Sequence, residues 1–168
     1  GTESASLVPE KAWAFPLVVA SAVAIVVAAL GSTITDLGPW YQSLKQPSWN
    51  PPDFVFPIVW TIVFGLTALA GATAWRAAPD TKSADYVIML FALNATLNIG
   101  WSLLFFRFQR PDWALIELTV LWVSIAVLIT YCGRFSRVAS LLLLPYLIWV
   151  TIAGLLNWQV AALNGPFS

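Results

Sequence analysis

Charged residues divide this chain into five long apolar runs. Each run is close to the ~20 residues that an α-helix needs to cross a ~30 Å hydrocarbon core. None alternates between apolar and polar positions as the strands of a membrane barrel do. The pattern predicts an all-α fold, an integral membrane bundle of five transmembrane helices in a single domain over residues 1–168. The predicted helices cover about residues 12–35, 54–75, 86–106, 113–133 and 138–163.

The composition agrees with a membrane protein. Hydrophobic residues make up 60% of the chain, charged residues only 10%, and the mean hydropathy is +0.81, whereas a soluble domain has roughly 45–50% apolar and about 25% charged residues. The net charge is zero, so nothing indicates a nucleic-acid partner. Histidine is absent and Cys132 is the single cysteine, so the sequence predicts no metal site.

The connection between the first two runs, residues 36–53, has a different composition. Its prolines are Pro39, Pro47, Pro51 and Pro52, and its large aromatic residues are Trp40, Tyr41 and Trp49. Proline lacks a backbone N–H and restricts the preceding residue to extended conformations. We therefore expect a stiff, ordered loop rather than a continuing helix, and we interpret it as the lid of a binding site.

Several amide and indole side chains lie deep within the runs, in the half of the membrane that this loop would cover. They are spaced by three or four residues on the third and fifth helices, so those of each helix share one face. Burying such groups in hydrocarbon is costly unless they face the bundle interior. The predicted pocket residues are Trp60, Asn94, Asn98, Trp101, Trp149, Ala153 and Asn157, with Tyr41, Trp49 and Pro51 from the loop.

A structural interpretation of the same residues stays open. Each asparagine is equally well explained by hydrogen bonds between neighbouring helices, which are worth ~1 kcal/mol. Trp13, Trp75 and Trp113 lie near helix ends, as interfacial tryptophans do. Trp122 lies too deep for that role, and we expect it in the core.

The predicted pocket favours binding over conventional catalysis. An apolar, aromatic lining with a few neutral hydrogen-bonding groups suits a flat, largely hydrophobic ligand that stacks on indole rings. The sequence offers no carboxylate pair, nucleophile–base pair or metal-ligand set for hydrolytic or acid–base chemistry. Glu117 is the one ionisable group within a run, and we expect it to be solvated near the rim.

Small residues and basic residues bear on assembly and orientation. Alanine, threonine and glycine recur at helical spacing on the first and third helices, which favours close helix packing, either within the bundle or across a homodimer on the third helix. The end shared by the N-terminus and the even-numbered connections has more basic residues, which predicts a cytoplasmic N-terminus. These residues are Lys11, Arg76, Lys82, Arg134 and Arg137, against Lys45, Arg107 and Arg110 at the other end.

The motifs resemble those of the translocator protein family, which includes the bacterial tryptophan-rich sensory proteins and the peripheral-type benzodiazepine receptor. The resemblance extends from Trp40 to Asn157. Its most specific part is Trp40-Tyr41-x2-Leu44-x2-Pro47-x-Trp49-x-Pro51-Pro52, followed by Phe56-Pro57-x2-Trp60. Further matches are Asn94-x3-Asn98-x2-Trp101 with Phe105-Phe106, and Pro145-Tyr146-x2-Trp149-x3-Ala153-x3-Asn157.

This resemblance implies a five-helix bundle, often dimeric, whose cavity is closed by the first loop. Family members bind porphyrins, including protoporphyrin IX and haem, and also sterols and benzodiazepine-type drugs, with no required cofactor. By motif, Tyr41 and Pro51 match the lid side of the cavity and Trp60, Asn94, Asn98, Trp149 and Ala153 its wall. The resemblance places such a protein in a bacterial cytoplasmic membrane or, alternatively, a mitochondrial outer membrane.

Three functions remain on this basis. The first is a membrane receptor or carrier for tetrapyrroles that contributes to their homeostasis or signalling. The second is light-dependent protoporphyrin degradation, for which the resemblance implicates Trp60 and Trp149. The third is an interaction protein whose loop docks a partner through Trp49. Sterol or lipid transport is a weaker alternative, since Trp158 and Ala162 stand where the family's cholesterol motif needs tyrosine and arginine.

Overall fold

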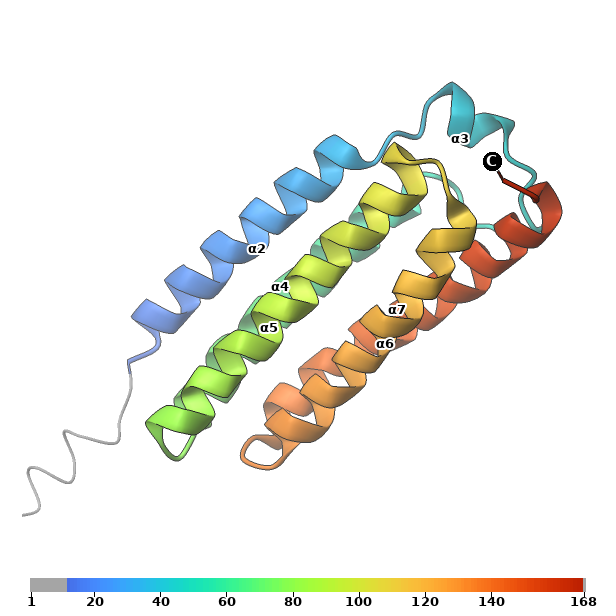
Figure 1. Ribbon diagram of the computed structural model, residues 1–168. Helices are drawn as coiled ribbons and strands as arrows, with labels where there is room; N and C mark the ends of the chain where they lie inside the picture. The colour runs from blue at the N-terminus through green and yellow to red at the C-terminus, as the bar shows by residue number, and fades with distance from the viewer. Residues whose placement is uncertain (1–11, 168) are drawn as a thin grey trace, which may run out of the picture.

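The computed structural model describes residues 12–167, and every regular element in that range is helical (Figure 1). Five helices are long and apolar enough to span a membrane, which confirms the predicted fold class. The elements are α2 (Ala14–Ile34), α3 (Pro39–Ser43), α4 (Val55–Ala77), α5 (Thr81–Ser102) with a π-helical turn η1 (Leu103–Arg107), α6 (Pro111–Gly133) and α7 (Arg137–Asn164).

The five long helices lie side by side, and the short α3 lies at the same end of the bundle as the C-terminus (Figure 1). The main core lies among α4, α5, α6 and α7, where buried leucine, valine and alanine side chains pack together. In contrast, α2 buries only Pro16 and Val27. The first helix is therefore the most loosely packed of the five.

The third membrane helix starts earlier than the positions of the flanking charged residues predicted. It begins at Thr81 rather than near residue 86, because Asp80 acts as its N-cap and accepts a hydrogen bond from the backbone N–H of Ser83 (2.7 Å). Lys82 and Asp85 therefore lie on the first turns of α5 and not in the connection.

The same helix ends in a π-helical turn. In η1 the backbone N–H of Phe108 bonds to the carbonyl of Leu103 (2.9 Å), five residues earlier, so the extra residue rotates the end of the helix. Phe105 and Phe106 are consecutive, yet both are buried, with 4% and 8% of their surface exposed. This turn thus directs two adjacent phenyl rings toward the interior.

The loop between α2 and α4 is tied to the rest of the bundle. The backbone of Lys45 bonds twice to the side chain of Asn164 at the end of α7, through its N–H (2.8 Å) and its carbonyl (2.9 Å). The ring of Tyr41 lies 5.9 Å from that of Phe106, and its side chain is buried. The amide of Gln42 joins the two ends of the loop. The loop is ordered, as its prolines predicted.

Candidate ligand-binding cavity

A cavity of about 400 Å³ lies beneath this loop, among α2, α4, α5 and α7. Helix α6 contributes no residue to its lining and instead packs behind α5 and α7. Its lining residues are Ala28, Gly31, Ser32 and Thr35 near the end of α2; Leu37, Tyr41 and Gln46 in the loop; Phe56, Pro57, Trp60, Thr61 and Phe64 on α4; Asn98, Trp101, Ser102, Phe105 and Phe106 on α5 and η1; and Trp149, Ala153, Leu156, Asn157 and Val160 on α7. Its volume falls within the 300–1,000 Å³ usual for small-molecule sites.

Aromatic rings make up much of the cavity wall. Trp60 and Trp149 meet edge to face, with ring centroids 6.2 Å apart and planes at 84°. Trp60 also stacks on Phe64 (5.4 Å), and Trp149 contacts Phe56 (5.8 Å). Such rings hold one another in fixed orientations and offer flat π surfaces to a ligand. The wall is therefore shaped for a planar, apolar molecule.

The asparagines of α5 belong to a chain of hydrogen bonds between helices. Asn98 donates to the hydroxyl of Tyr146 (2.8 Å), which donates to Asn94 (3.1 Å), which in turn donates to Ser124 of α6 (3.0 Å). The side chains of Asn98, Tyr146 and Asn94 are all buried. This chain joins α5 to α6 and α7 at mid-membrane, which is the structural role that the sequence left open for these amides.

Asn157 has a similar structural role nearer the loop. Its carbonyl oxygen accepts a hydrogen bond from the indole N–H of Trp101 (3.0 Å), and its NH₂ donates to the backbone carbonyl of Pro111 (2.9 Å). One buried side chain thus links α5, α6 and α7. It fixes the Trp101 ring against the cavity.

Two lining residues hold buried polar atoms that have no hydrogen-bond partner among residues 12–167. They are the indole nitrogen of Trp149 and both amide atoms of Gln46. An unpaired buried donor or acceptor costs ~1–3 kcal/mol, so each such group in a native structure calls for a partner. Because both residues line the cavity, a ligand inside it can supply these partners.

Tyr41 covers the cavity from the loop. Burial raises the pKa of its phenol above the ordinary value, assisted by the nearby Asp53 carboxylate and opposed by a hydrogen bond with Asn50. The hydroxyl therefore stays neutral across the physiological pH range. The loop presents an uncharged surface to the cavity at this point.

The cavity brings together seven of the ten residues named from the sequence: Tyr41, Trp60, Asn98, Trp101, Trp149, Ala153 and Asn157. The other three lie elsewhere. Trp49 is 44% exposed on the loop, Pro51 is half-buried outside the lining, and Asn94 faces a neighbouring cavity.

Sequence reasoning missed other parts of the lining. Gln46 occupies an unspecified position just before the motif residue Pro47 and carried no signal beyond being an amide in the loop. Phe105 and Phe106 were noted only as a motif, since consecutive residues normally point to different sides of a helix. Phe64 is apolar and gave no signal, and the small and hydroxyl residues at the end of α2, such as Ser32 and Thr35, were not singled out.

Two expectations about single residues were wrong. Trp122 is not in the core, because 38% of its surface is exposed and its indole donates to Thr151 on the outside of the bundle (2.9 Å). Glu117 is only partly solvated, since one of its carboxylate oxygens is buried and has no hydrogen-bond partner in the described part of the chain. Its other oxygen lies against the backbone of Gly100, where a larger residue would displace it.

The fold and the cavity define a five-helix membrane protein with an aromatic interior compartment under a fixed loop. The chain matches the model of the TspO/MBR family over residues 12–163 and belongs to that family. It is 43% identical to the tryptophan-rich protein TspO of Chlorobaculum tepidum, over 80% of this chain and 86% of that one. It is 32% identical to protein CrtK of Rhodobacter capsulatus (84% and 89%) and 30% identical to the translocator protein of Bos taurus (72% of each).

Proposed function

We propose that this protein is a membrane receptor or carrier that binds tetrapyrroles, such as protoporphyrin IX or haem, in the cavity beneath the loop. The observation that carries the proposal is the combination of edge-to-face indoles with unpartnered hydrogen-bonding groups in one cavity of about 400 Å³. A planar macrocycle covers the aromatic walls, and its nitrogen or carboxylate atoms pair with Trp149 and Gln46. No charged residue is found in the lining over residues 12–167, which favours a largely hydrophobic ligand.

The names of the relatives agree with a role in recognition or carriage. One relative at 34% identity is called a tryptophan-rich sensory protein, and the bovine relative is called a translocator protein. In this chain three of the ten tryptophans, Trp60, Trp101 and Trp149, belong to the cavity wall. Ligand-dependent signalling and ligand carriage both begin with binding there.

The test is a titration of the purified protein with protoporphyrin IX in the dark, followed by tryptophan fluorescence. Quenching should saturate at low stoichiometry, and Trp149→Ala should weaken binding by at least about tenfold, since it removes both an unpaired donor and a stacking surface. Trp158→Ala is the matched control, because Trp158 lies on the same helix but is 54% exposed on the outside. Quenching that never saturates, or that ignores Trp149→Ala, refutes the proposal.

Light-dependent porphyrin degradation is a second candidate function, favoured by the direct contact of Trp60 with Trp149 in the cavity wall. Here the excited porphyrin is the light absorber, dioxygen is the oxidant, and an indole beside the macrocycle takes part in the oxidation. Under illumination, Trp60→Phe and Trp149→Phe should slow the loss of porphyrin absorbance. Trp122→Phe, which changes an indole outside the lining, should not. Equal rates in all variants would leave binding as the only function of the cavity.

We further propose that the protein forms a homodimer through α5 and sits in a bacterial cytoplasmic membrane with its N-terminus inside. Thr96 is exposed on α5 and lies outside the lining of both cavities of the bundle, and a small residue at such a position suits close helix contact. In the native membrane, Thr96→Cys should form a disulfide-linked dimer on oxidation. Labelling of a cysteine placed at Ser48 in the loop only from the outside would support the orientation, and labelling only from the inside would overturn it.

A further inference from the structure

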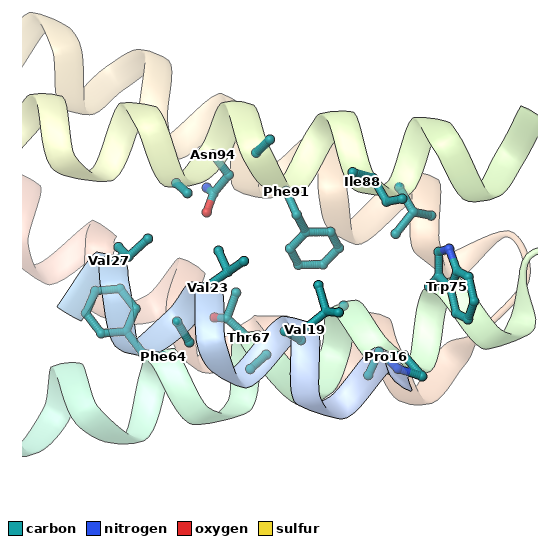
Figure 2. A pocket seen from close by; sticks show the side chains of 18 of the residues that line it. Pro16, Val19, Val23, Val27, Phe64, Thr67, Trp75, Ile88, Phe91 and Asn94 are labelled. Carbon is teal, nitrogen blue, oxygen red and sulfur yellow. The ribbon is translucent and has the colours of Figure 1, made fainter. Parts of the chain in front are cut away.

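A second cavity lies on the opposite half of the bundle from the loop. It has a volume of about 230 Å³ and runs between α2 on one side and α4 and α5 on the other. Figure 2 shows it with Phe64 near one end, Trp75 at the other, and the ring of Phe91 pointing into the space between α2 and α5. The cavity is a consequence of the loose packing of α2, which buries only two of its residues.

The lining of this groove offers a ligand almost nothing but hydrocarbon. Small and branched aliphatic residues predominate, including Ala20, Ala24 and Ala68. The hydroxyl of Thr67 is bonded to the carbonyl of Val63 (2.7 Å), and Asn94 is held by Ser124 and Tyr146. In contrast to the cavity under the loop, the described lining residues hold no buried side-chain nitrogen or oxygen that lacks a hydrogen-bond partner. Such a lining suits an apolar chain better than a macrocycle or sterol that needs its polar atoms matched.

The groove is also open along its length. Val19 and Val23 on α2 and Ile88 on α5 belong to its lining, yet they are 44%, 51% and 55% exposed. In a membrane these exposed edges face lipid. An acyl chain of the surrounding bilayer can enter sideways, without passing through the loop or the aqueous phase.

The dimensions match one chain of a phospholipid. On α2 the lining extends from Phe15 to Val27, which at 1.5 Å per residue is ~18 Å. Half of a ~30 Å hydrocarbon core is ~15 Å, so the groove is as long as one leaflet is thick. Beyond Trp75 at its outer end, the guanidinium of Arg76 lies 3.8 Å from the centroid of the Trp13 ring, so a basic residue and an interfacial indole mark the level of the lipid headgroups.

We propose that this groove is a binding site for one acyl chain of a phospholipid, with its phosphate at the Arg76 end. The bound chain supplies the packing that α2 lacks against α5. Because Phe64 and Asn98 line both cavities, the inner end of the lipid chain touches the wall of the compartment under the loop. The lipid site itself does not depend on what that compartment binds.

The test is native mass spectrometry of the purified full-length protein with added palmitoyl-oleoyl phosphatidylglycerol. The wild-type protein should retain one lipid, and Ala24→Phe should lower the retained fraction by at least about tenfold at equal lipid concentration, because the new ring fills the groove. Ala22→Phe is the matched control, since Ala22 lies on the same helix but faces outward. Free glycerol phosphate should not compete, whereas a single-chain lysophospholipid should.

Ala68→Leu narrows the groove from the α4 side, and it replaces Ala24→Phe if that variant does not fold. Dark porphyrin titration of the same samples reports separately on the compartment under the loop, so failure of one site is distinguishable from failure of the other. Equal lipid retention in folded Ala24→Phe and Ala22→Phe overturns the proposal. The proposal is also overturned if Val23→Cys forms a dimer that holds no lipid and is cross-linked through the two introduced cysteines. A second copy of the chain would then cover the groove.

Discussion

The loop that closes the aromatic compartment is bonded to the bundle by the side chain of Asn164 at the end of α7. Its amide accepts from the N–H of Lys45 (2.8 Å) and donates to the carbonyl of Lys45 (2.9 Å) and of Val160 (2.9 Å). A hydrogen bond of this kind contributes ~0.5–1.5 kcal/mol net. Asn164→Ala removes both bonds to the loop, at a partly exposed site, so loop closure should weaken by ~1–2 kcal/mol.

That loss converts into a measurable rate. At about 1.4 kcal/mol per factor of ten, the backbone amide of Lys45 should exchange with deuterium ~5–30-fold faster in Asn164→Ala than in the wild-type protein. Porphyrin release, if the loop is the exit, should speed up by a similar factor. The assay is residue-resolved hydrogen exchange by NMR in the absence of ligand, so it does not depend on any proposal about function.

Two variants serve as controls for this prediction. Asn164→Asp keeps an acceptor for the Lys45 N–H but loses the donor, so its exchange rate should be intermediate. Gln159→Ala removes another amide from α7 that makes neither bond and should leave the rate unchanged. Wild-type exchange at Lys45 in Asn164→Ala would refute the reasoning, because the aromatic contact of Tyr41 with Phe106 would then be sufficient to hold the loop.

Three further predictions test the interior. Asn157→Leu leaves the indole N–H of Trp101 without its partner and should destabilise the protein by ~1–3 kcal/mol, measured by thermal unfolding in detergent; an unchanged melting temperature would show that the bond is dispensable. Tyr146→Phe removes the hydroxyl that joins the two buried asparagines of α5 and should cost ~1–2 kcal/mol, with Tyr131→Phe as a control outside that chain. Gln46→Leu should weaken porphyrin binding ~2–10-fold through the lost hydrogen bonds while sparing a purely hydrocarbon ligand, and equal losses for both would indicate a shape effect.

The sequence was sufficient to predict the helices because membrane-length apolar runs and their flanking charges are direct consequences of bilayer thickness. The loop was predictable for a related reason, since proline excludes a continuing helix. The charges were less reliable as boundaries: Asp80 caps α5, and Lys82 and Asp85 lie inside the helix. A charge near the membrane surface marks the interface and not the end of a helix.

The rotation of each helix was harder to predict. Lipid tails are as apolar as a protein core, so an apolar residue carries no information about which side it faces. Trp122 turned outward for this reason, whereas Trp101 could be placed through Asn157 and Asn98. The inward direction of Phe105 and Phe106 depends on the π-helical turn. The helical periodicity of the sequence does not predict such a turn.

The central claim is that a planar ligand binds against the wall formed by Trp60 and Trp149 beneath the loop. The most direct measurement is ¹⁵N NMR of the indole N–H groups, one for each of the ten tryptophans, recorded while protoporphyrin IX is added in the dark. The account predicts that the signal of Trp149 shifts most and becomes protected from exchange, followed by Trp60, while exposed Trp158 stays in place. A shift of Trp158 with no change at Trp149 would contradict it and place the porphyrin on the outside of the bundle.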